Sequence, residues 1–294
     1  KRAVAFIAGW NRAVKDVLAV IIDRRVDVVI GVGGYAAAPA YLAARRAGVP
    51  LVVHEANARP GLANRLAARW TRFVGVAFEG TPLRHARFVG MPLRPEIQSL
   101  DVALARTGAR EKFGFSEDQP VVMVTGGSLG SRQINTAIVR AQAALLRAGI
   151  QVLHIAGIGG EQGNIQPGYV AMEYCDDMGE ALSVADVVIS RAGSSTVSEL
   201  AALGIPAVFV PYAVGNGEQK LNAAASVRAG GAVLVSDSDF TAEWVEHNLI
   251  PLASSSSKLA DMAQAMKSTG TRAGSELTVN LVFEALASRS STAS

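Results

Sequence analysis

The sequence alternates short runs of Val, Ile and Leu with segments that carry apolar residues at helical spacing. The apolar runs VDVVIGVGG (26–34), PLVVHE (50–55) and RFVGVAF (72–78) are bounded by Gly, Pro or charged residues, which is typical of fully buried parallel strands. Between them lie PAYLAARRAG (39–48) and PGLANRLAARW (60–70), whose periodicity predicts helices. Strands joined through helices in this way form a parallel sheet. The first part of the chain is therefore predicted to be a doubly wound α/β domain.

A second series of the same kind begins at PVVMVTGG (120–127). Residues 79–120 separate the two series and contain several prolines, with one short charged helix expected near 101–113. The strands predicted in the second series lie near residues 151–156, 168–173, 186–190, 206–210 and 232–235, and the last 50 residues are predicted to be mostly helical. We therefore predict two Rossmann-like domains, the first of them incomplete. They span residues 1–98 and 99–288, and a disordered Ser-rich tail follows at 289–294.

Composition excludes several classes of protein. Half of the residues are hydrophobic and 18% are charged, which excludes a disordered chain. No apolar run reaches the roughly 18–20 residues of a membrane span. Cys175 is the only cysteine, so an internal disulfide and a cysteine-based metal site are excluded and a reducing cytoplasm is favoured. The net charge of +3 fits an anionic substrate or an acidic membrane surface. The sequence contains no basic stripe interleaved with aromatic residues, so nucleic-acid binding is not predicted.

The stretch RAGSSTVSEL (191–200) leaves a predicted strand through one arginine, one glycine and several hydroxyl side chains. Gly193 permits a close backbone turn, and any of the three hydroxyl residues after it is able to cap the next helix. Glu199 would lie in the first turns of that helix and accept hydrogen bonds from a ribose diol. A helix cap explains one hydroxyl group, and a bound ligand explains the excess. Both interpretations stay open at this level.

Two further strand-to-helix loops have the same placement. TGGSLGSRQIN (125–135) offers backbone N–H groups that favour a phosphate or sugar hydroxyls, and a plain tight turn is the alternative. In PYAVGNGEQKLNA (211–223), the side chains of Glu218, Gln219 and Asn222 suit sugar hydroxyls, and an exposed helix start is the alternative. Because ligands of open α/β sheets bind at the carboxyl ends of the strands, we expect these loops to share one site.

Other residues suggest chemistry less specifically. His54 and Glu55 end a predicted strand and suit acid–base work, but a hydrogen-bonded structural histidine is the commoner alternative. Asp176 and Asp177 resemble a metal motif, although capping of the following helix is preferred. The sequence contains no nucleophile elbow and no paired zinc-binding histidines. We therefore predict no cofactor and no metal site.

Seven stretches, in this order, resemble the MurG family of cell-wall glycosyltransferases. They are VGGYAAAPAYLAA, VVHEANARPGLANR, VGMPLR, VTGGSLGSRQIN, YCDDM, SRAGSSTVSELAALGIPAVFVP and GNGEQKLNA, between residues 26 and 223. The resemblance implies the GT-B architecture, in which two Rossmann-like domains face a cleft and the second holds the nucleotide sugar. It also implies the reaction: inverting transfer of N-acetylglucosamine (GlcNAc) from UDP-GlcNAc to lipid I, the undecaprenyl-diphospho-muramyl-pentapeptide, to give lipid II for peptidoglycan.

The resemblance further implies the substrate-binding residues. Asn57 and Arg94 match positions that face the donor across the cleft, and Ser128 matches a contact to the donor phosphates. Cys175 would offer its backbone to the uracil, and Glu199 would bind the ribose hydroxyls. The loop expected to cradle the diphosphate comprises Gly193, Ser194, Ser195, Thr196, Val197 and Ser198, and the pair expected to read the GlcNAc hydroxyls comprises Glu218 and Gln219. The catalytic base is not identified.

The chain departs from the family pattern at three places. Glu218 stands where many members have a glutamine, and Ser-Ser-Thr (194–196) replaces the usual Ala-Leu-Thr type. The family's N-terminal glycine-rich loop, GGTGGH, does not occur, so the resemblance implies that about 65–70 residues of the first Rossmann-like domain precede Lys1. Two alternatives follow: a non-catalytic UDP-sugar-binding or scaffolding fragment, and a GT-B transferase with another acceptor.

The first segment, KRAVAFIAGWNRAVK (1–15), places Phe6, Ile7, Trp10 and Val14 at helical spacing among basic residues. Such a segment is able to lie on an anionic membrane surface, and a domain helix with its apolar face in the core is the alternative. The resemblance implies a peripheral location at the cytoplasmic face of the cell membrane. There the partners would be UDP-GlcNAc, lipid I and complexes of cell-wall synthesis.

Overall fold

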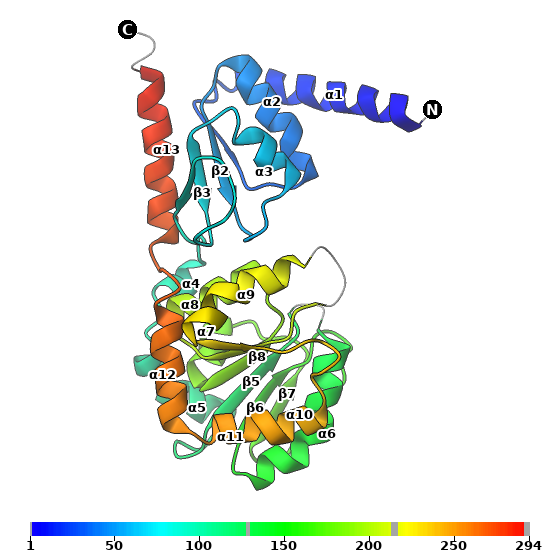
Figure 1. The fold of residues 1–294 in the computed structure, drawn as a ribbon, viewed down its shortest axis with the longest axis vertical. Helices are drawn as coiled ribbons and strands as arrows, with labels where there is room; N and C mark the ends of the chain where they lie inside the picture. The colour runs from blue at the N-terminus through cyan, green and yellow to red at the C-terminus, as the bar shows by residue number, and fades with distance from the viewer. Residues whose placement is uncertain (1, 128–129, 213–216, 291–294) are drawn as a thin grey trace. The chain divides into compact units, whose positions relative to one another are not determined.

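The computed structural model, which describes residues 2–127, 130–212 and 217–290, divides the chain into two α/β units (Figure 1). The second unit spans Leu93–Arg272, and the first contains Lys1–Pro92 together with Ala273–Ser294. The predicted boundary lay at 98/99 and assigned the C-terminal helices to the second domain. The structure instead returns the last helix to the first unit. Periodicity specifies the apolar face of a helix but not the sheet that this face covers.

The first unit is built on four parallel strands in the order β1-β2-β3-β4. Its elements are α1 (Arg2–Asp23), β1 (Val29–Gly31), η1 (Tyr35–Ala37), α2 (Ala38–Ala47), β2 (Leu51–Glu55), α3 (Leu62–Ala67), β3 (Phe73–Val76), β4 (Ala86–Phe88) and α13 (Gly274–Ser290). The predicted strands and helices up to residue 78 are confirmed. The short strand β4 was not predicted, because all three of its residues are exposed and no buried apolar run marks it. On one face of the sheet, Val52 and Phe73 pack against Leu281 and Ala285 of α13.

Helix α1 tests the interpretation of the first segment. Val14 is fully buried and packs with Trp10 against Ala43 and Ala44 of α2, so this part of its apolar face is core. Only the helical backbone is described for the residues around Phe6, so a membrane-facing surface there stays a prediction. Within the described residues, no helix is both long and apolar enough to cross a membrane.

The second unit has six parallel strands in the order β10-β9-β8-β5-β6-β7. Its elements are α4 (Pro95–Gln98), α5 (Val102–Phe113), β5 (Val121–Thr125), α6 (Arg132–Arg147), β6 (Gln151–Ile155), β7 (Tyr169–Met172), α7 (Met178–Val184), β8 (Val187–Ser190), α8 (Ser194–Leu203), β9 (Ala207–Phe209), α9 (Glu218–Ala229), β10 (Ala232–Leu234), α10 (Ala242–Trp244), η2 (Val245–Leu249), α11 (Ile250–Ala253) and α12 (Ser256–Lys267). All six strands had been predicted, and the doubly wound fold class is confirmed. The tail predicted from residue 289 begins inside α13, and residues 291–294 lie outside the described residues.

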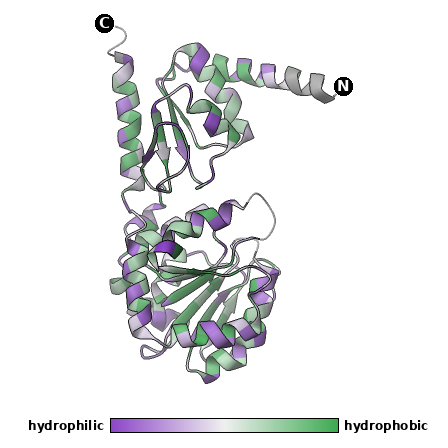
Figure 2. Ribbon diagram, viewed as in Figure 1, coloured by the Kyte–Doolittle hydropathy of each residue, from purple (hydrophilic) through white to green (hydrophobic). Residues whose placement is uncertain are grey.

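The core of the second unit shows why its strands are so apolar. Val122 and Val124 of β5 point to the face covered by α6, η2 and α11, where Ile134 and Leu249 are fully buried. Met123, on the opposite face, is buried as well. In Figure 2 the central strands of this sheet are accordingly green, while the helices around them mix green and purple. A sheet buried on both faces leaves only its loops available for a ligand.

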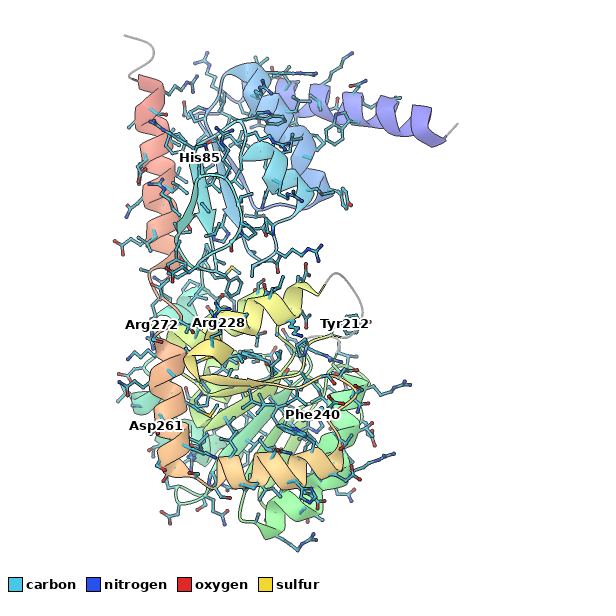
Figure 3. The ribbon with its side chains drawn as sticks, viewed as in Figure 1. His85, Tyr212, Arg228, Phe240, Asp261 and Arg272 are labelled. Carbon is cyan, nitrogen blue, oxygen red and sulfur yellow. The ribbon has the colours of Figure 1, made fainter. Side chains whose placement is uncertain are left out.

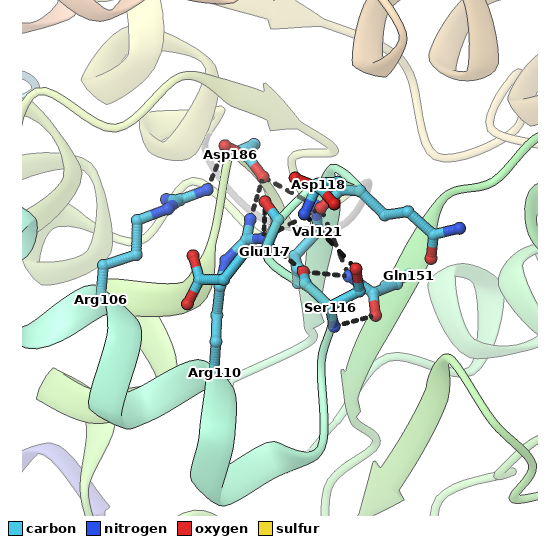
Figure 4. A network of polar contacts seen from close by, with 9 residues as sticks. Arg106, Arg110, Ser116, Glu117, Asp118, Val121, Gln151 and Asp186 are labelled. Atoms are coloured by element: carbon cyan, nitrogen blue, oxygen red, sulfur yellow. Dashed lines mark hydrogen bonds and ion pairs between the residues drawn. The ribbon is translucent and has the colours of Figure 1, made fainter.

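A polar network closes the amino edge of this sheet (Figure 4). The Asp186 carboxylate accepts hydrogen bonds from Arg106 (2.5 Å), Arg110 (3.0 Å) and the Val121 N–H (2.7 Å). Arg110 is 1% exposed, and its guanidinium also donates to the carbonyl groups of the loop that leads into β5. Desolvation lowers the pKa of Arg110. These bonds fix α5 to the starts of β5 and β8, at the edge opposite the predicted site.

Candidate functional site

Three loops meet at the carboxyl edge of the second unit's sheet. The register pairs Thr125 of β5 with Ser190 of β8, and Ser190 with Phe209 of β9. These strands therefore end side by side, and the loops after them, which begin at residues 126, 191 and 210, emerge at one edge. This juxtaposition agrees with the expectation from sequence that the three loops share one site.

The glycine loop after β5 has no room for side chains at two positions. A Cβ atom on Gly126 would lie 2.2 Å from the Ser131 nitrogen, and one on Gly130 would lie 2.2 Å from the Ala156 carbonyl oxygen. Gly130 also has a positive φ of 70°, which L side chains rarely adopt. The loop ends at Ser131, whose hydroxyl caps α6 by accepting from the Ile134 N–H. Ser128, the predicted phosphate contact, lies outside the described residues.

Helix α8 begins without a side-chain cap. Its N-cap is Gly193 in an extended conformation, so the interpretation that one of the hydroxyl residues caps the helix is wrong. Ser194, Ser195 and Thr196 instead form the first turn, where backbone N–H groups lack partners within the helix. Val197 is buried at 1% exposure, and its N–H donates to the Gly193 carbonyl at 3.0 Å, so it begins the hydrogen-bonded part of the helix. An uncapped helix N-terminus beside a glycine loop is a favourable place for an anion.

A cavity of about 200 Å³ opens beside this helix start. Its lining residues are Met123, Thr125, Gly127, Ile155, Glu173, Tyr174, Cys175, Met178, Leu182, Val188, Thr196, Glu199 and Leu200. Strand and helix residues such as Met123, Val188 and Leu200 give it an apolar floor, whereas Thr196 and Glu199 supply polar groups. Three residues named from the sequence, Cys175, Thr196 and Glu199, therefore share one cavity.

Cys175 lines this cavity as a neutral thiol. Burial raises its pKa, and its Sγ–H donates to the Asp177 carbonyl at 3.2 Å. Asp177 caps α7 by accepting from the Glu180 N–H at 3.0 Å, which confirms the capping interpretation of the Asp-Asp pair. Within the described ranges, no group of three or more His, Cys, Asp or Glu residues is able to hold a metal ion.

Glu199 carries a carboxylate that is only 15% exposed. Burial raises its pKa, and the nearby Arg94 guanidinium opposes that shift. Arg94 lies between two carboxylates, 3.4 Å from Glu199 and 3.5 Å from Glu96, and is half exposed. The contact to Glu199 is long and comes from a half-exposed guanidinium, so it leaves the Glu199 carboxylate available for exchange with a ligand. Within the second unit, Arg94 thus lies next to Glu199.

The loop before α9 orients the two residues predicted to read a sugar. Glu218 and Gln219 are the first residues of α9, after Gly217 with a positive φ of 75°. The Gln219 side-chain oxygen accepts from the Tyr212 N–H at 2.9 Å, so its amide N–H groups are directed away from that bond. Asn222 does not line the same surface: it is buried, and it donates to the Ala192 carbonyl at 3.3 Å.

Arg191 joins these loops, a role that the sequence did not reveal. Its guanidinium donates to Ser131 Oγ at 2.7 Å, to the carbonyls of Val210 and Pro211, and to the Asp237 carboxylate. The signal available in the sequence was an arginine placed directly after a buried strand, where the chain reaches the edge of the sheet.

The remaining candidates belong to the first unit. His54 is 3% exposed, its Nε2 lies 2.8 Å from the Gly90 carbonyl oxygen, and burial lowers its pKa. The Glu55 carboxylate accepts from the N–H groups of Asn57 and Gly61 and from the Asn64 amide. Glu55 is therefore used to shape the loop after β2, and His54 ties the end of β2 to Gly90 after β4, which favours the structural interpretation of His54. Asn57 lies in that loop, with its backbone tied to Glu55.

The comparisons with known proteins agree with this geometry. Residues 121–277 match the model of the glycosyltransferase family 28 C-terminal domain, and residues 4–76 match that of the N-terminal domain. Among curated proteins, the chain is 53% identical to the UDP-N-acetylglucosamine–N-acetylmuramyl-(pentapeptide) pyrophosphoryl-undecaprenol N-acetylglucosamine transferase of Leifsonia xyli, over 95% of this chain and 78% of that protein. The protein of the same name from Clavibacter sepedonicus is 51% identical over 98% of this chain and 79% of its own length.

Solved structures show the same architecture. The crystal structure of Acinetobacter baumannii MurG superposes with a TM-score of 0.76 at 27% identity, over 92% of this chain and 77% of that one. The UDP-GlcNAc 2-epimerase from Neisseria meningitidis, bound to UDP-GlcNAc, superposes with a TM-score of 0.64 at 14% identity, over 94% and 81% of the two chains. The second likeness concerns the fold alone.

Proposed function

The chain belongs to glycosyltransferase family 28, and from that premise we propose that it is a UDP-GlcNAc-dependent hexosyltransferase. It transfers GlcNAc to lipid I and so forms lipid II for peptidoglycan. The names of the curated relatives state both the sugar donated and the undecaprenyl-linked muramyl-pentapeptide that receives it. Identities of 50–53% to three such relatives favour this acceptor over another one.

The donor would bind at the carboxyl edge of the second unit's sheet. The cavity shared by Cys175, Thr196 and Glu199 is the observation that carries this assignment. Its apolar floor suits a flat pyrimidine ring, with Cys175 offering backbone groups at the rim. Glu199 would accept hydrogen bonds from the ribose diol, because a partly buried carboxylate is a strong acceptor. Arg94, beside Glu199, would exchange that contact for one to the donor.

The diphosphate would lie at the start of α8. The backbone N–H groups of residues 194–196 have no side-chain cap to satisfy them, and the helix dipole favours negative charge there. The glycine loop after β5 lies at the same cavity, which Gly127 and Thr196 both line, so its backbone would contribute to the diphosphate site. These groups would stabilise the charge that develops on UDP as it leaves.

The GlcNAc moiety would extend toward the start of α9. Gln219 offers hydrogen-bond donors there, since its oxygen is already bonded to the Tyr212 N–H. Glu218, in place of the glutamine found in many family members, offers only acceptors when ionised. Glu218 would accept a hydrogen bond from one sugar hydroxyl, and the Gln219 amide would donate one to another.

The reaction itself would be a single displacement with inversion. The C4 hydroxyl oxygen of the muramyl sugar forms a bond to C1 of GlcNAc, the bond from C1 to the diphosphate oxygen breaks, and UDP leaves with the electron pair. The hydroxyl proton passes to a general base. His54 is a weak candidate for that base, because its ring is buried and bonded to the Gly90 carbonyl.

The acceptor is a membrane lipid, so the protein would work at the cytoplasmic face of the membrane as a peripheral protein. The basic residues Arg12 and Lys15 on the exposed side of α1 support such a location, since they suit anionic headgroups. Association with further cell-wall synthesis proteins stays a prediction.

Calorimetry and a transfer assay test the proposal at two levels. We expect UDP-GlcNAc to bind the full chain more tightly than UDP-glucose does, and radiolabelled GlcNAc to pass from UDP-GlcNAc to lipid I in detergent micelles. Absence of UDP binding would contradict the donor site altogether. Binding without transfer would instead favour the alternative of a UDP-sugar-binding protein.

A further inference from the structure

Arg191 makes four hydrogen bonds at the proposed donor edge. Its Nη1 donates to the Val210 carbonyl at 3.0 Å, to the Pro211 carbonyl at 3.1 Å and to the Asp237 carboxylate, while its Nη2 donates to Ser131 Oγ at 2.7 Å. The side chain is 14% exposed, and Asp237 is 26% exposed. One planar guanidinium therefore fixes the ends of loops that follow three different strands, a geometry that only arginine provides.

Arg191 is also linked, through Tyr212, to Gln219, one of the two residues predicted to bind the sugar. Its guanidinium lies against the ring of Tyr212, with Cζ 5.5 Å from the ring centroid. The Tyr212 backbone N–H in turn donates to the Gln219 oxygen at 2.9 Å. Two contacts thus lead from Arg191 to the amide of Gln219, and the carbonyls of Val210 and Pro211 hold the backbone just before Tyr212.

These contacts decide which part of the Gln219 amide is available. Because the Tyr212 N–H occupies the amide oxygen, the amide nitrogen is left to donate. If the backbone at residue 212 moved, the amide would be free to rotate and present either end. A sugar hydroxyl would then meet an unfixed partner.

We propose that Arg191 is a positioning residue for donor-sugar recognition, anchored by Asp237 and Ser131 and acting on Gln219 through Tyr212. It touches no substrate itself. The proposal rests on the donor site argued above and goes beyond it by naming what orients the sugar-reading amide. Its signature is selective: loss of Arg191 or of the Tyr212 ring weakens recognition of the GlcNAc moiety more than recognition of UDP.

Tyr212 allows a matched pair of variants, because the residue is 58% exposed and removing its ring should leave the fold intact. Tyr212→Ala removes the contact with Arg191, whereas Tyr212→Phe keeps the ring and removes only the hydroxyl. We expect Tyr212→Ala to lower the ratio of UDP-GlcNAc affinity to UDP affinity by about two- to fivefold, the effect of losing one exposed cation–π contact. Tyr212→Phe should leave the ratio unchanged.

Arg191→Lys provides the stronger perturbation, since a lysine keeps the charge near Asp237 but loses the fork of donors. Its effect on the same ratio should exceed that of Tyr212→Ala. Arg228→Lys, at the far end of α9, is the control for a change of arginine to lysine; Figure 3 labels Arg228 and Tyr212. Asp237→Asn keeps Arg191 in place with a weaker anchor, so it serves if Arg191→Lys does not fold.

A double-variant cycle separates positioning from direct contact. If Arg191 and Tyr212 act through Gln219, then Gln219→Ala should remove their effect, and adding Tyr212→Ala to it should change the affinity ratio no further. Additive losses would overturn the proposal, as would equal weakening of UDP and UDP-GlcNAc by Arg191→Lys. Failure of the unchanged chain to bind UDP-GlcNAc would instead refute the proposed donor site, so the two failures are distinguishable.

Discussion

Replacement of Glu199 by glutamine tests the proposed ribose contact most directly. The Glu199 carboxylate lies in the proposed donor cavity, is 15% exposed and makes a long contact of 3.4 Å to the half-exposed Arg94. In the proposed complex it accepts two hydrogen bonds from the ribose diol. Glutamine keeps the shape and one acceptor oxygen but presents an N–H₂ group to the second hydroxyl. Loss of one hydrogen bond to a charged group costs about 1.5–3 kcal/mol, which lowers UDP affinity roughly 10- to 150-fold.

The same substitution has an opposite effect on stability, and the sign follows from the pKa. Burial raises the pKa of Glu199 in the folded protein, so the folded state binds more protons than the unfolded state between the two pKa values. Stability therefore falls as the pH rises through that window. Glutamine has no proton to lose, so Glu199→Gln should raise the melting temperature slightly at neutral pH while it weakens donor binding.

Calorimetry with UDP and with 2′-deoxy-UDP makes this test specific. The unchanged protein should lose affinity for the deoxy ligand, whereas Glu199→Gln should discriminate little between the two. Glu96→Gln is the matched control, because Glu96 also contacts Arg94 (3.5 Å) but lies outside the cavity lining. Equal discrimination against the deoxy ligand by the protein and by Glu199→Gln would refute the ribose assignment.

Three further perturbations test the glycine loop of the site and the packing of the second unit. Gly126→Ala should abolish UDP binding in calorimetry, because its Cβ would lie 2.2 Å from the Ser131 nitrogen. Gly108→Ala in α5 is the control: open space surrounds Gly108, so UDP binding should stay unchanged and the helix should be stabilised by about 0.5–1 kcal/mol. Asp186→Asn should destabilise the second unit by about 3 kcal/mol, since it removes the counter-charge of the buried Arg110; scanning calorimetry should show a fall of roughly 6–12 °C, and no fall would contradict the network. Because burial lowers the pKa of His154 to about 4, stability should fall by roughly 3 kcal/mol as the pH drops from 6.5 to 4, and urea midpoints independent of pH would refute this.

The fold was predictable where burial left a pattern. The central strands β5, β6, β8 and β9 are buried along their whole length, so their apolar runs stand out in the sequence. The half-buried edge strands β7 and β10 keep enough of this pattern, and each strand of the second unit was located within one or two residues. Strand β4 has no such run, and its three exposed residues gave no signal. Helix α13 was expected as a helix, but its packing on β2 and β3 of the first unit depends on where the chain returns, which no local pattern encodes.

The candidate site shows a similar division, and it explains why Arg191 was missed while its neighbours were found. Residues 193–199 were singled out because an excess of hydroxyl groups is visible in the sequence itself, and the uncapped start of α8 agrees that these groups do not serve as a helix cap. Arg191 has no such local signature. Its partners lie 19, 20, 46 and 60 residues away in the sequence, on loops that the parallel register of β5, β8, β9 and β10 brings together. Residues proposed to contact a ligand can therefore be singled out from local chemistry in the sequence, whereas residues proposed to hold those contacts in place depend on topology and leave no local pattern.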